Sequence, residues 1–359
     1  MTPRKPLPGT PRPKLAWTGT HGNRLCGDSW GDPSAPPVVL LHGGGQTRHS
    51  WRRTALSLAQ AGFHAVAYDA RGHGDSDWVP SGDYGDAAMA QDLACVLRGI
   101  AGAGAAARPV LIGASMGGIT GLVATGEAAV QAAALILADV LHTTAPAGFE
   151  RVRGFMTRHA QGFASLQEAA DAIGAYQGTQ AHRRRSPAGL AKNLRQGADG
   201  RLYWHWDPRF LDGREDLAAR ARRLAQCARR LAVPTLLVRG AHSDVVTDEA
   251  VREFLALCPR ASHVDVPGAG TCSRGMTTMP SVRWRSASFA KEHSRQGPAQ
   301  RQGRPSVVPR APPLESGGGE REMSISMQYG DVLLHRGEPL PDDFLTRRQD
   351  VPAQERDWT

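Results

Sequence analysis

The stretch Gly113-Ala114-Ser115-Met116-Gly117 constrains the fold of this chain more than any other. It follows an apolar run at 110–112 and precedes another at 119–125, which predicts a buried strand, a sharp turn and a helix. We expect Ser115 at the tip of that turn, in a strained conformation that the flanking glycines make sterically possible. The helix N-terminus would then place N–H groups beside a developing negative charge. Because glycine and serine are common in loops, the motif needs support from the rest of the chain.

Apolar runs alternate with helical segments along most of the sequence. The runs at 38–41, 63–69, 109–114, 132–140, 234–240 and 262–266 predict strands, and 48–61, 84–100, 217–231 and 249–257 predict helices. Residues 15–19 and 24–30 add two short strands. The order predicts an α/β fold, a doubly wound and mostly parallel sheet with helices on both faces, over residues 14–270. Residues 1–13 are basic and proline-rich without an apolar core, and are expected to be a disordered leader rather than a secretory signal.

The alternation breaks at residues 141–216, which we expect to form a lid over the carboxyl edge of the sheet. An aromatic cluster occupies its end, with Trp204 and Trp206 flanking His205. These two tryptophans either line an apolar substrate pocket or only hold the lid to the body, and the sequence leaves both interpretations open.

Three glycines follow the predicted strand at 38–41 and supply bare backbone N–H groups above the sheet. The N–H of Gly44 or Gly45, together with that of Met116, is expected to form an oxyanion hole. A flexible glycine loop without a function is the alternative. Asp244 follows the strand at 234–240, where a catalytic histidine needs an orienting carboxylate, and Asp139 is the less favoured acid. His73 lies in a glycine turn ahead of the serine and is interpreted as structural.

The composition excludes several classes of protein. A net charge of +9 raises the question of nucleic acid, but the arginines are scattered and not interleaved with aromatic residues, so nucleic-acid binding is not expected. No stretch is apolar and long enough to span a bilayer. The 5 cysteines form no CxxC pair, so we expect neither a metal site nor a disulfide framework, and a reducing cytoplasm fits. The expected partner is a small-molecule substrate.

Four segments together resemble the α/β-hydrolase fold family, within its branch of cofactor-free haloperoxidase-like and esterase-like bacterial hydrolases. They are the segments at 42–51, 68–77, 113–118 and 204–208, and the resemblance covers about residues 15–270. It implies that Ser115 is the nucleophile and Asp244 the triad acid, that no cofactor is needed, and that the substrate is an ester or lactone of a small to medium apolar acid. The family places its catalytic histidine directly after the segment that matches 267–270, and this chain has Thr271 there.

The sequence after Gly270 changes character, since residues 271–322 are rich in Arg, Ser, Pro and Gly and lack periodicity. Residues 271–359 are therefore expected to be a disordered, non-homologous tail, with a possible short strand at 329–334. If one base is restored before the codon of Thr271, the shifted frame can encode His-Met-Phe-Ala-Gly-Asp, the family's expected continuation. We interpret the tail as the product of a one-base deletion, which a sequencing error would imitate.

The sequence thus predicts a serine hydrolase whose catalysis is impaired because the triad histidine is missing. His242 and His263 are poorly placed to replace it, and His293 is the one candidate after the last strand within reach of the site. A non-catalytic binding protein with a hydrolase fold, or an inactive gene product, is the alternative. Loss of the final helix also predicts that apolar surface near the last strand is exposed or poorly covered.

Overall fold

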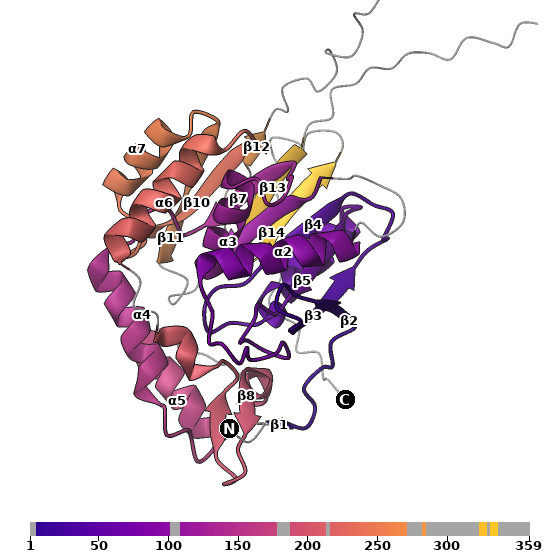
Figure 1. The fold of residues 1–359 in the computed structure, drawn as a ribbon, viewed down its shortest axis with the longest axis vertical. Coiled ribbons are helices and arrows are strands. Elements are labelled where there is room, and N and C mark those ends of the chain that lie inside the picture. Colours follow the sequence, from indigo (N-terminus) through magenta and orange to yellow (C-terminus); the bar gives the residue numbers. More distant parts are fainter. Residues whose placement is uncertain are drawn as a thin grey trace, which may run out of the picture.

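The structure is a computed structural model that describes residues 5–100, 108–177, 187–212, 216–270, 282–284, 323–328 and 331–336. A central sheet of 8 strands organises these residues (Figure 1). Its strands lie side by side in the order β11 (Ala261–Gly270), β10 (Thr235–His242), β7 (Ala134–Ala138), β6 (Val110–Ala114), β4 (Pro37–Leu41), β5 (His64–Tyr68), β3 (Arg24–Trp30) and β2 (Leu15–Thr18). The strands from β11 to β5 are parallel, and β3 and β2 continue the sheet antiparallel. The predicted α/β class and mostly parallel sheet are confirmed.

The apolar strands are buried on both faces, which explains their unbroken sequence patterns. In β4, Val39 and Leu41 face one core while Val38 and Leu40 face the other. The first core lies under helices α2 (Asp86–Ile100), α3 (Met116–Gly126), α6 (Leu217–Arg230) and α7 (Asp248–Leu257). The second lies under η1 (Arg48–Trp51) and α1 (Arg52–Gln60). Each strand therefore contributes burial on two sides, which favours Val, Ile and Leu at consecutive positions.

The insertion between β7 and α6 corresponds to the predicted lid. Its described elements are α4 (Pro146–Arg158), α5 (Leu166–Gln177), η3 (Pro187–Asn193), β8 (Leu194–Gln196), β9 (Leu202–Trp204) and η4 (Pro208–Leu211). All of these elements except η3 contribute to an apolar cluster of the insertion's own, in which Phe163 is fully buried. Figure 1 shows α4, α5 and β8 beyond one end of the sheet strands. The insertion is thus a small packed unit and not a loose loop.

The amino-terminal segment differs from its expected disorder where the structure describes it. Strand β1 (Lys5–Pro6) pairs antiparallel with β8 of the insertion (Figure 1). The carbonyl oxygen of Pro11 accepts a hydrogen bond of 3.1 Å from the Arg48 guanidinium. Composition cannot reveal these partners because both lie far away in the sequence.

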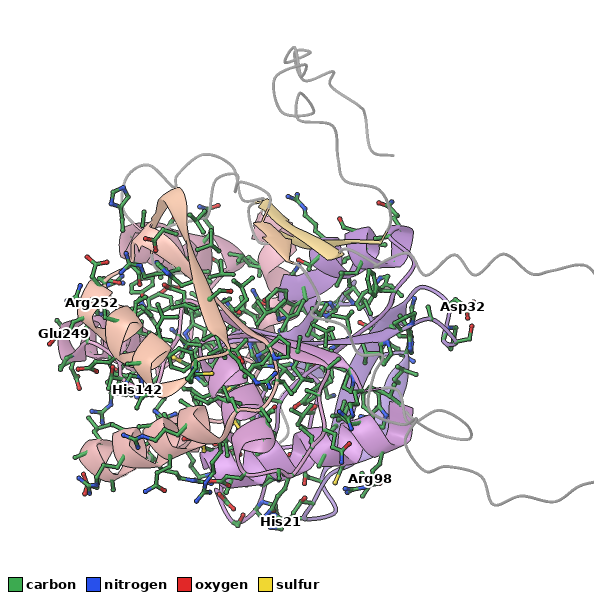
Figure 2. The ribbon with its side chains drawn as sticks, turned by 90° about the horizontal axis from the view of Figure 1, so that it is seen from above. His21, Asp32, Arg98, His142, Glu249 and Arg252 are labelled. Atoms are coloured by element: carbon green, nitrogen blue, oxygen red, sulfur yellow. The ribbon has the colours of Figure 1, made fainter. Side chains whose placement is uncertain are left out.

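Three short strands are described in the tail, namely β12 (Val282–Trp284), β13 (Met323–Gln328) and β14 (Asp331–Arg336). They pair antiparallel, and β14 overlaps the possible strand at 329–334. Strand β14 lies against α1, on the side of the sheet opposite α2 and α3 (Figure 2). The other tail residues, including Thr271 and His293, lie outside the described residues, so the disordered tail stays a prediction there.

The apolar surface near the last strand is not exposed. Val266 and Val238 are each 0% exposed and Leu236 is buried as well, while Val264 is partly buried. The expectation of an exposed face is therefore wrong for these residues. Among the described helices, none has the length and hydropathy that crossing a membrane requires.

Candidate active site

Ser115 lies at the turn between β6 and α3, and its backbone has φ 48° and ψ −119°. An L-residue reaches this region only under strain, which surrounding structure must hold in place. A side chain at Gly117 would collide with the Leu41 carbonyl, and one at Gly113 with the carbonyl of Gly117. Only glycine therefore permits the close passage of strand and helix on either side of Ser115, whose side chain is exposed above the sheet. These features are those of a nucleophile elbow.

A tight turn of glycines lies directly beside this serine. The N–H of Gln46 donates to the Gly43 carbonyl at 3.1 Å, and Gly45 between them has φ 73°. A positive φ at this position is what a type II turn requires. A Cβ built on Gly43 would lie 3.4 Å from the Cβ of Ser115, so the turn and the serine are in contact.

Three backbone N–H groups near the serine are available for an oxyanion. The described hydrogen bonds of the turn use the N–H groups of Gly43 and Gln46, and include none from Gly44 or Gly45. Met116 is the first residue of α3, where the helix supplies no acceptor for an N–H. The structure thus brings Gly44, Gly45 and Met116 to the same side of the sheet as Ser115.

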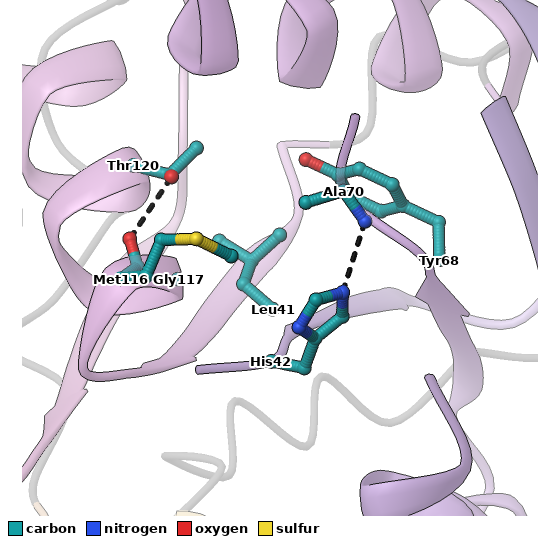
Figure 3. Close-up of a pocket in the computed structure, with 7 residues that line it drawn as sticks. All are labelled: Leu41, His42, Tyr68, Ala70, Met116, Gly117 and Thr120. Carbon is teal, nitrogen blue, oxygen red and sulfur yellow. Dashed lines mark hydrogen bonds between the residues drawn. The ribbon is translucent and has the colours of Figure 1, made fainter. Parts of the chain in front are cut away.

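His42 supports the turn from below, a role that the sequence did not assign. Its Nε2 accepts the Ala70 N–H at 2.9 Å (Figure 3), so Nδ1 carries the proton and donates to the Gly43 carbonyl at 2.8 Å. Burial lowers the pKa of His42 to about 4, which keeps the ring neutral. A small pocket separates this ring from Met116 and Thr120 of α3 (Figure 3). The position of His42 at the end of β4, just before the glycines, could have suggested this role.

A buried cluster of charged side chains surrounds Arg48, which follows the glycine turn in the sequence. Arg48 is 0% exposed, and its guanidinium bonds Asp28 at 2.8 Å, Asp69 at 2.6 Å and Asp75 at 2.8 Å. Arg195 of β8 adds a second contact to Asp75 at 2.9 Å. Removing one partner from such a cluster would leave a buried charge uncompensated, so the cluster fixes this part of the backbone.

Asp244 lies in the loop after β10, as predicted, but a lid residue holds its carboxylate. The guanidinium Nη2 of Arg151, from α4, lies 2.6 Å from one carboxylate oxygen and 2.8 Å from the other. A side chain at Gly148 would collide with the Asp244 carbonyl, and the Ala145 N–H donates to the Val245 carbonyl at 3.0 Å. Helix α4 therefore sits directly on the loop that carries this acid.

Asp139, the alternative acid, is placed differently. It follows β7, is 3% exposed and has φ 53°. The preceding residue, Ala138, accepts the Ser115 N–H at 3.3 Å. Asp139 thus lies next to the strand end that contacts the elbow, in a strained conformation of its own. Both carboxylates remain candidates.

The described histidines do not supply a hydrogen-bonded base for Ser115. His142 faces α7, with Nε2 3.5 Å from a Glu253 oxygen, and Figure 2 shows it beside that helix. His242 is exposed and pairs with Gly270 in the ladder between β10 and β11. His263 lies 3.8 Å from Asp265 in the same strand. His73 is fully buried with its Nδ1 at 3.1 Å from the Arg71 carbonyl, which fits the structural role expected of it.

The two predicted pocket tryptophans lie in different surroundings. Their rings stack with centroids 4.9 Å apart, and both are buried. Trp204 packs against Phe163 inside the lid, whereas Trp206 lies against Gly45 of the turn. Trp204 therefore fits the interpretation of a residue that holds the lid together, and Trp206 is the one at the candidate site.

Two apolar residues at this site were not predicted from the sequence. A Cβ built on Gly44 would lie 3.3 Å from the Phe210 ring, and one on Gly45 would lie 3.1 Å from the Met156 methyl group. Phe210 comes shortly after the aromatic cluster in the sequence, and this proximity could have indicated that it belongs to the same site. Met156 belongs to α4 and has no distinctive pattern. Among the described residues, no group of His, Cys, Asp or Glu is arranged to hold a metal ion.

Comparisons with known proteins show what this chain is similar to. The sequence model of a family described as "alpha/beta hydrolase fold" matches residues 36–273. An esterase of Mycobacterium tuberculosis, Rv0045c, is 31% identical over 65% of this chain and 74% of its own. A 3-hydroxybutyrate-oligomer hydrolase of Cupriavidus necator is 29% identical over 70% of this chain and 87% of its own. A solved structure of the Mycobacterium tuberculosis esterase superposes with a TM-score of 0.55, at 28% identity over 73% of this chain and 86% of that one.

Proposed function

Because this chain belongs to the α/β-hydrolase fold family, we propose that it descends from a serine hydrolase of carboxylic esters in which Ser115 is the nucleophile. The observation that carries the proposal is the strained, exposed Ser115 in contact with a glycine turn whose N–H groups remain available. A strained serine with oxyanion donors beside it serves acyl transfer. The similar proteins are named as an esterase and an oligomer hydrolase, which favours an ester bond as the target.

The proposed mechanism uses the residues in the following roles. The Ser115 hydroxyl attacks the substrate carbonyl, and the N–H groups of Met116 and of Gly44 or Gly45 stabilise the oxyanion. A histidine transfers the serine proton to the leaving alcohol, and Asp244 orients that histidine. Water then attacks the acyl-enzyme and releases the acid and the free serine. In a perhydrolase, a carboxylic acid would form the acyl-enzyme with loss of water, and hydrogen peroxide would release the acyl group as a peracid. Met156, Trp206 and Phe210 suit a small to medium apolar acyl group, as an ester or a lactone.

We further propose that catalysis is impaired in the chain as it stands. Thr271 occupies the position where the resemblance implies the triad histidine, and a threonine hydroxyl accepts no proton at neutral pH. Removing one member of the triad leaves about 10³- to 10⁴-fold acceleration over water, from the oxyanion hole and binding alone. The family match ends at residue 273, close to the proposed change of reading frame.

Three proteins test the proposal, namely the chain as it stands, its Thr271→His variant and a chain with the reading frame restored. We expect the frame-restored protein to hydrolyse p-nitrophenyl esters and Ser115→Ala to abolish that activity. The chain as it stands should be about 10²-fold or more slower, and Thr271→His should recover little because its loop is also altered. Absence of turnover of every ester, lactone and peracid substrate by the frame-restored protein would refute the hydrolase assignment. Rates within about tenfold between the first and third proteins would refute the impairment.

A non-catalytic role as a ligand-binding protein is the second candidate. The observation that favours it is the ion pair between Arg151 and Asp244, in which a lid residue binds the proposed acid. A fluorophosphonate probe separates the two candidates because it labels only an activated serine. Strong labelling of Ser115 in the chain as it stands would argue for a substitute base. In the frame-restored protein, labelling of Ser115 would support the hydrolase, and no labelling would favour the binding protein.

A further inference from the structure

The lid places one buried histidine against the glycine turn. His205 lies between β9 and η4 and is 1% exposed. Its Nδ1 accepts the Gly74 N–H at 2.8 Å, and its Nε2 lies 3.2 Å from the Gly45 carbonyl oxygen. A backbone N–H can only donate, so Nδ1 is unprotonated and Nε2 carries the proton that Gly45 accepts. The ring therefore bridges two loops of the body from the lid side.

The Gly45 carbonyl is a sensitive point of the turn. The peptide that joins Gly45 to Gln46 is planar, so fixing its carbonyl also fixes the Gln46 N–H on the opposite edge. That N–H closes the turn onto the Gly43 carbonyl at 3.1 Å. The N–H groups of Gly44 and Gly45 lie within this closed turn, and their direction depends on it. His205 thus acts on the proposed oxyanion donors through one backbone oxygen.

The segment around His205 is well anchored, which makes it a rigid support. The His205 N–H donates to the Asn193 carbonyl at 3.2 Å, and the Asp207 N–H donates to the Gly72 carbonyl at 2.8 Å. The Asp207 carboxylate also accepts the Tyr84 hydroxyl at 2.5 Å. A ring held in this way exerts a defined constraint on the turn, since its own backbone is bonded to Asn193 within the lid and Asp207, two residues on, is bonded to the body.

The charge state of the ring suits this role. Burial lowers the pKa of His205 well below its usual value, and the nearby His73 and Arg195 lower it further. A neutral ring offers one acceptor and one donor, which are the two functions that Gly74 and Gly45 require. Protonation would replace the acceptor by a donor facing the Gly74 N–H.

We propose that His205 is a positioning residue through which the lid sets the direction of the oxyanion donors Gly44 and Gly45. The inference rests on the proposed function of the turn as an oxyanion hole. The oxyanion hole is then ordered only when the lid is packed against the body, because the ring reaches Gly45 only when the segment 204–208 is in place. His205 touches no substrate in this arrangement and acts only through the Gly45 carbonyl.

Two matched substitutions separate the halves of the bridge in the full chain. The amide nitrogen of His205→Gln falls near the position of Nε2 and can still donate to Gly45. The amide oxygen of His205→Asn falls near Nδ1 and can accept only from Gly74. Amide hydrogen exchange at Gly43 and Gln46 reports the turn, and exchange at Gly74 reports the other loop.

We expect His205→Asn to raise exchange at Gly43 and Gln46 by about tenfold or more while Gly74 stays protected, and His205→Gln to show the reverse. In the frame-restored protein, the Ser115-dependent hydrolysis of p-nitrophenyl acetate should fall about 10- to 100-fold in kcat with unchanged KM in His205→Asn, and should be largely restored in His205→Gln. Phe163→Leu, a lid-core change away from the turn, controls for general damage to the lid. It should lower stability and change amide exchange equally in the turn and in the loop of Gly74.

Equal exchange in the two His205 variants, or an unaltered turn in His205→Asn, would overturn the inference. If neither variant folds, nitrogen NMR of His205 in the unaltered chain remains decisive, since a protonated Nδ1 or a cationic ring contradicts the bridge. Neither exchange nor NMR requires turnover. Absence of any Ser115-dependent hydrolysis in the frame-restored protein would therefore refute the proposed function and leave the structural inference to be judged by these two measurements.

Discussion

The Arg151 guanidinium binds both carboxylate oxygens of Asp244, at 2.6 and 2.8 Å, from a helix of the lid. The carboxylate that we propose as the triad acid is thus paired with a guanidinium from a residue 93 positions away in the sequence. A histidine placed after Gly270 would have to compete with this guanidinium for the same oxygens. The pair therefore couples the lid to the proposed acid whether or not a histidine is present.

We predict that Arg151→Met increases activity in the frame-restored protein. Removing the guanidinium frees Asp244 for the histidine, and kcat for p-nitrophenyl esters should rise severalfold. The side chains are 30% and 44% exposed, so the change in unfolding free energy should be about 1 kcal/mol or less. If Asp139 is the acid instead, Arg151→Met leaves kcat unchanged and Asp139→Asn abolishes it. Steady-state kinetics of both variants decide between the two carboxylates.

The backbone strain at Ser115 predicts a difference in stability between two inactive variants. Glycine tolerates φ 48° without a Cβ, whereas alanine retains the strain. Ser115→Gly should therefore unfold with a free energy about 1 kcal/mol higher than Ser115→Ala, after the entropy cost of glycine in the unfolded chain. Urea unfolding of the two proteins measures this directly. A less stable Ser115→Gly would mean that the elbow carries no strain.

The buried histidines predict loss of stability on mild acidification. Burial lowers the pKa of His42 to about 4 and that of His73 to about 3. As the pH falls below about 6.5, the unfolded chain binds protons that the folded chain cannot take up, so the free energy of unfolding decreases. Each such histidine should cost about 2 kcal/mol between pH 7.5 and pH 5. Urea midpoints across this range test the prediction, and His42→Gln should flatten the slope. A pH-independent midpoint would contradict neutral buried rings.

Phe210 is predicted to limit the length of the acyl group. Its ring lies against Gly44, on the side of the proposed oxyanion donors. In the frame-restored protein, Phe210→Ala should shift the preferred p-nitrophenyl ester to longer acyl chains, with about a tenfold change in the ratio of kcat/KM values. Phe149→Ala, at an exposed position of α4, serves as the matched control and should leave the ratio unaltered. The same chain-length profile in both variants would place the acyl group elsewhere.

The sequence predicted those features that depend on short-range patterns. The apolar runs around Leu40 and Ile112 identified central strands because both faces of those strands are buried. The elbow at Ser115 was recognisable because its glycines follow from local steric demands. The contact between His205 and Gly45 spans 160 positions and has no local signature. The contact of Arg151 with Asp244 could not be predicted from the sequence either, since an arginine on a helix is ordinarily a solvated charge.

The pairing of β1 with β8 joins Lys5 to Gln196, so the lid includes a strand that precedes the whole central sheet in the sequence. During synthesis this strand is made before the central sheet, and its partner follows roughly 190 residues later. At the usual rates of translation that interval is about 10 to 40 s. Contacts of such long range form late because the closure of the intervening chain must come first. The small sheet of the lid is therefore expected to be completed only after most of the central sheet has been made.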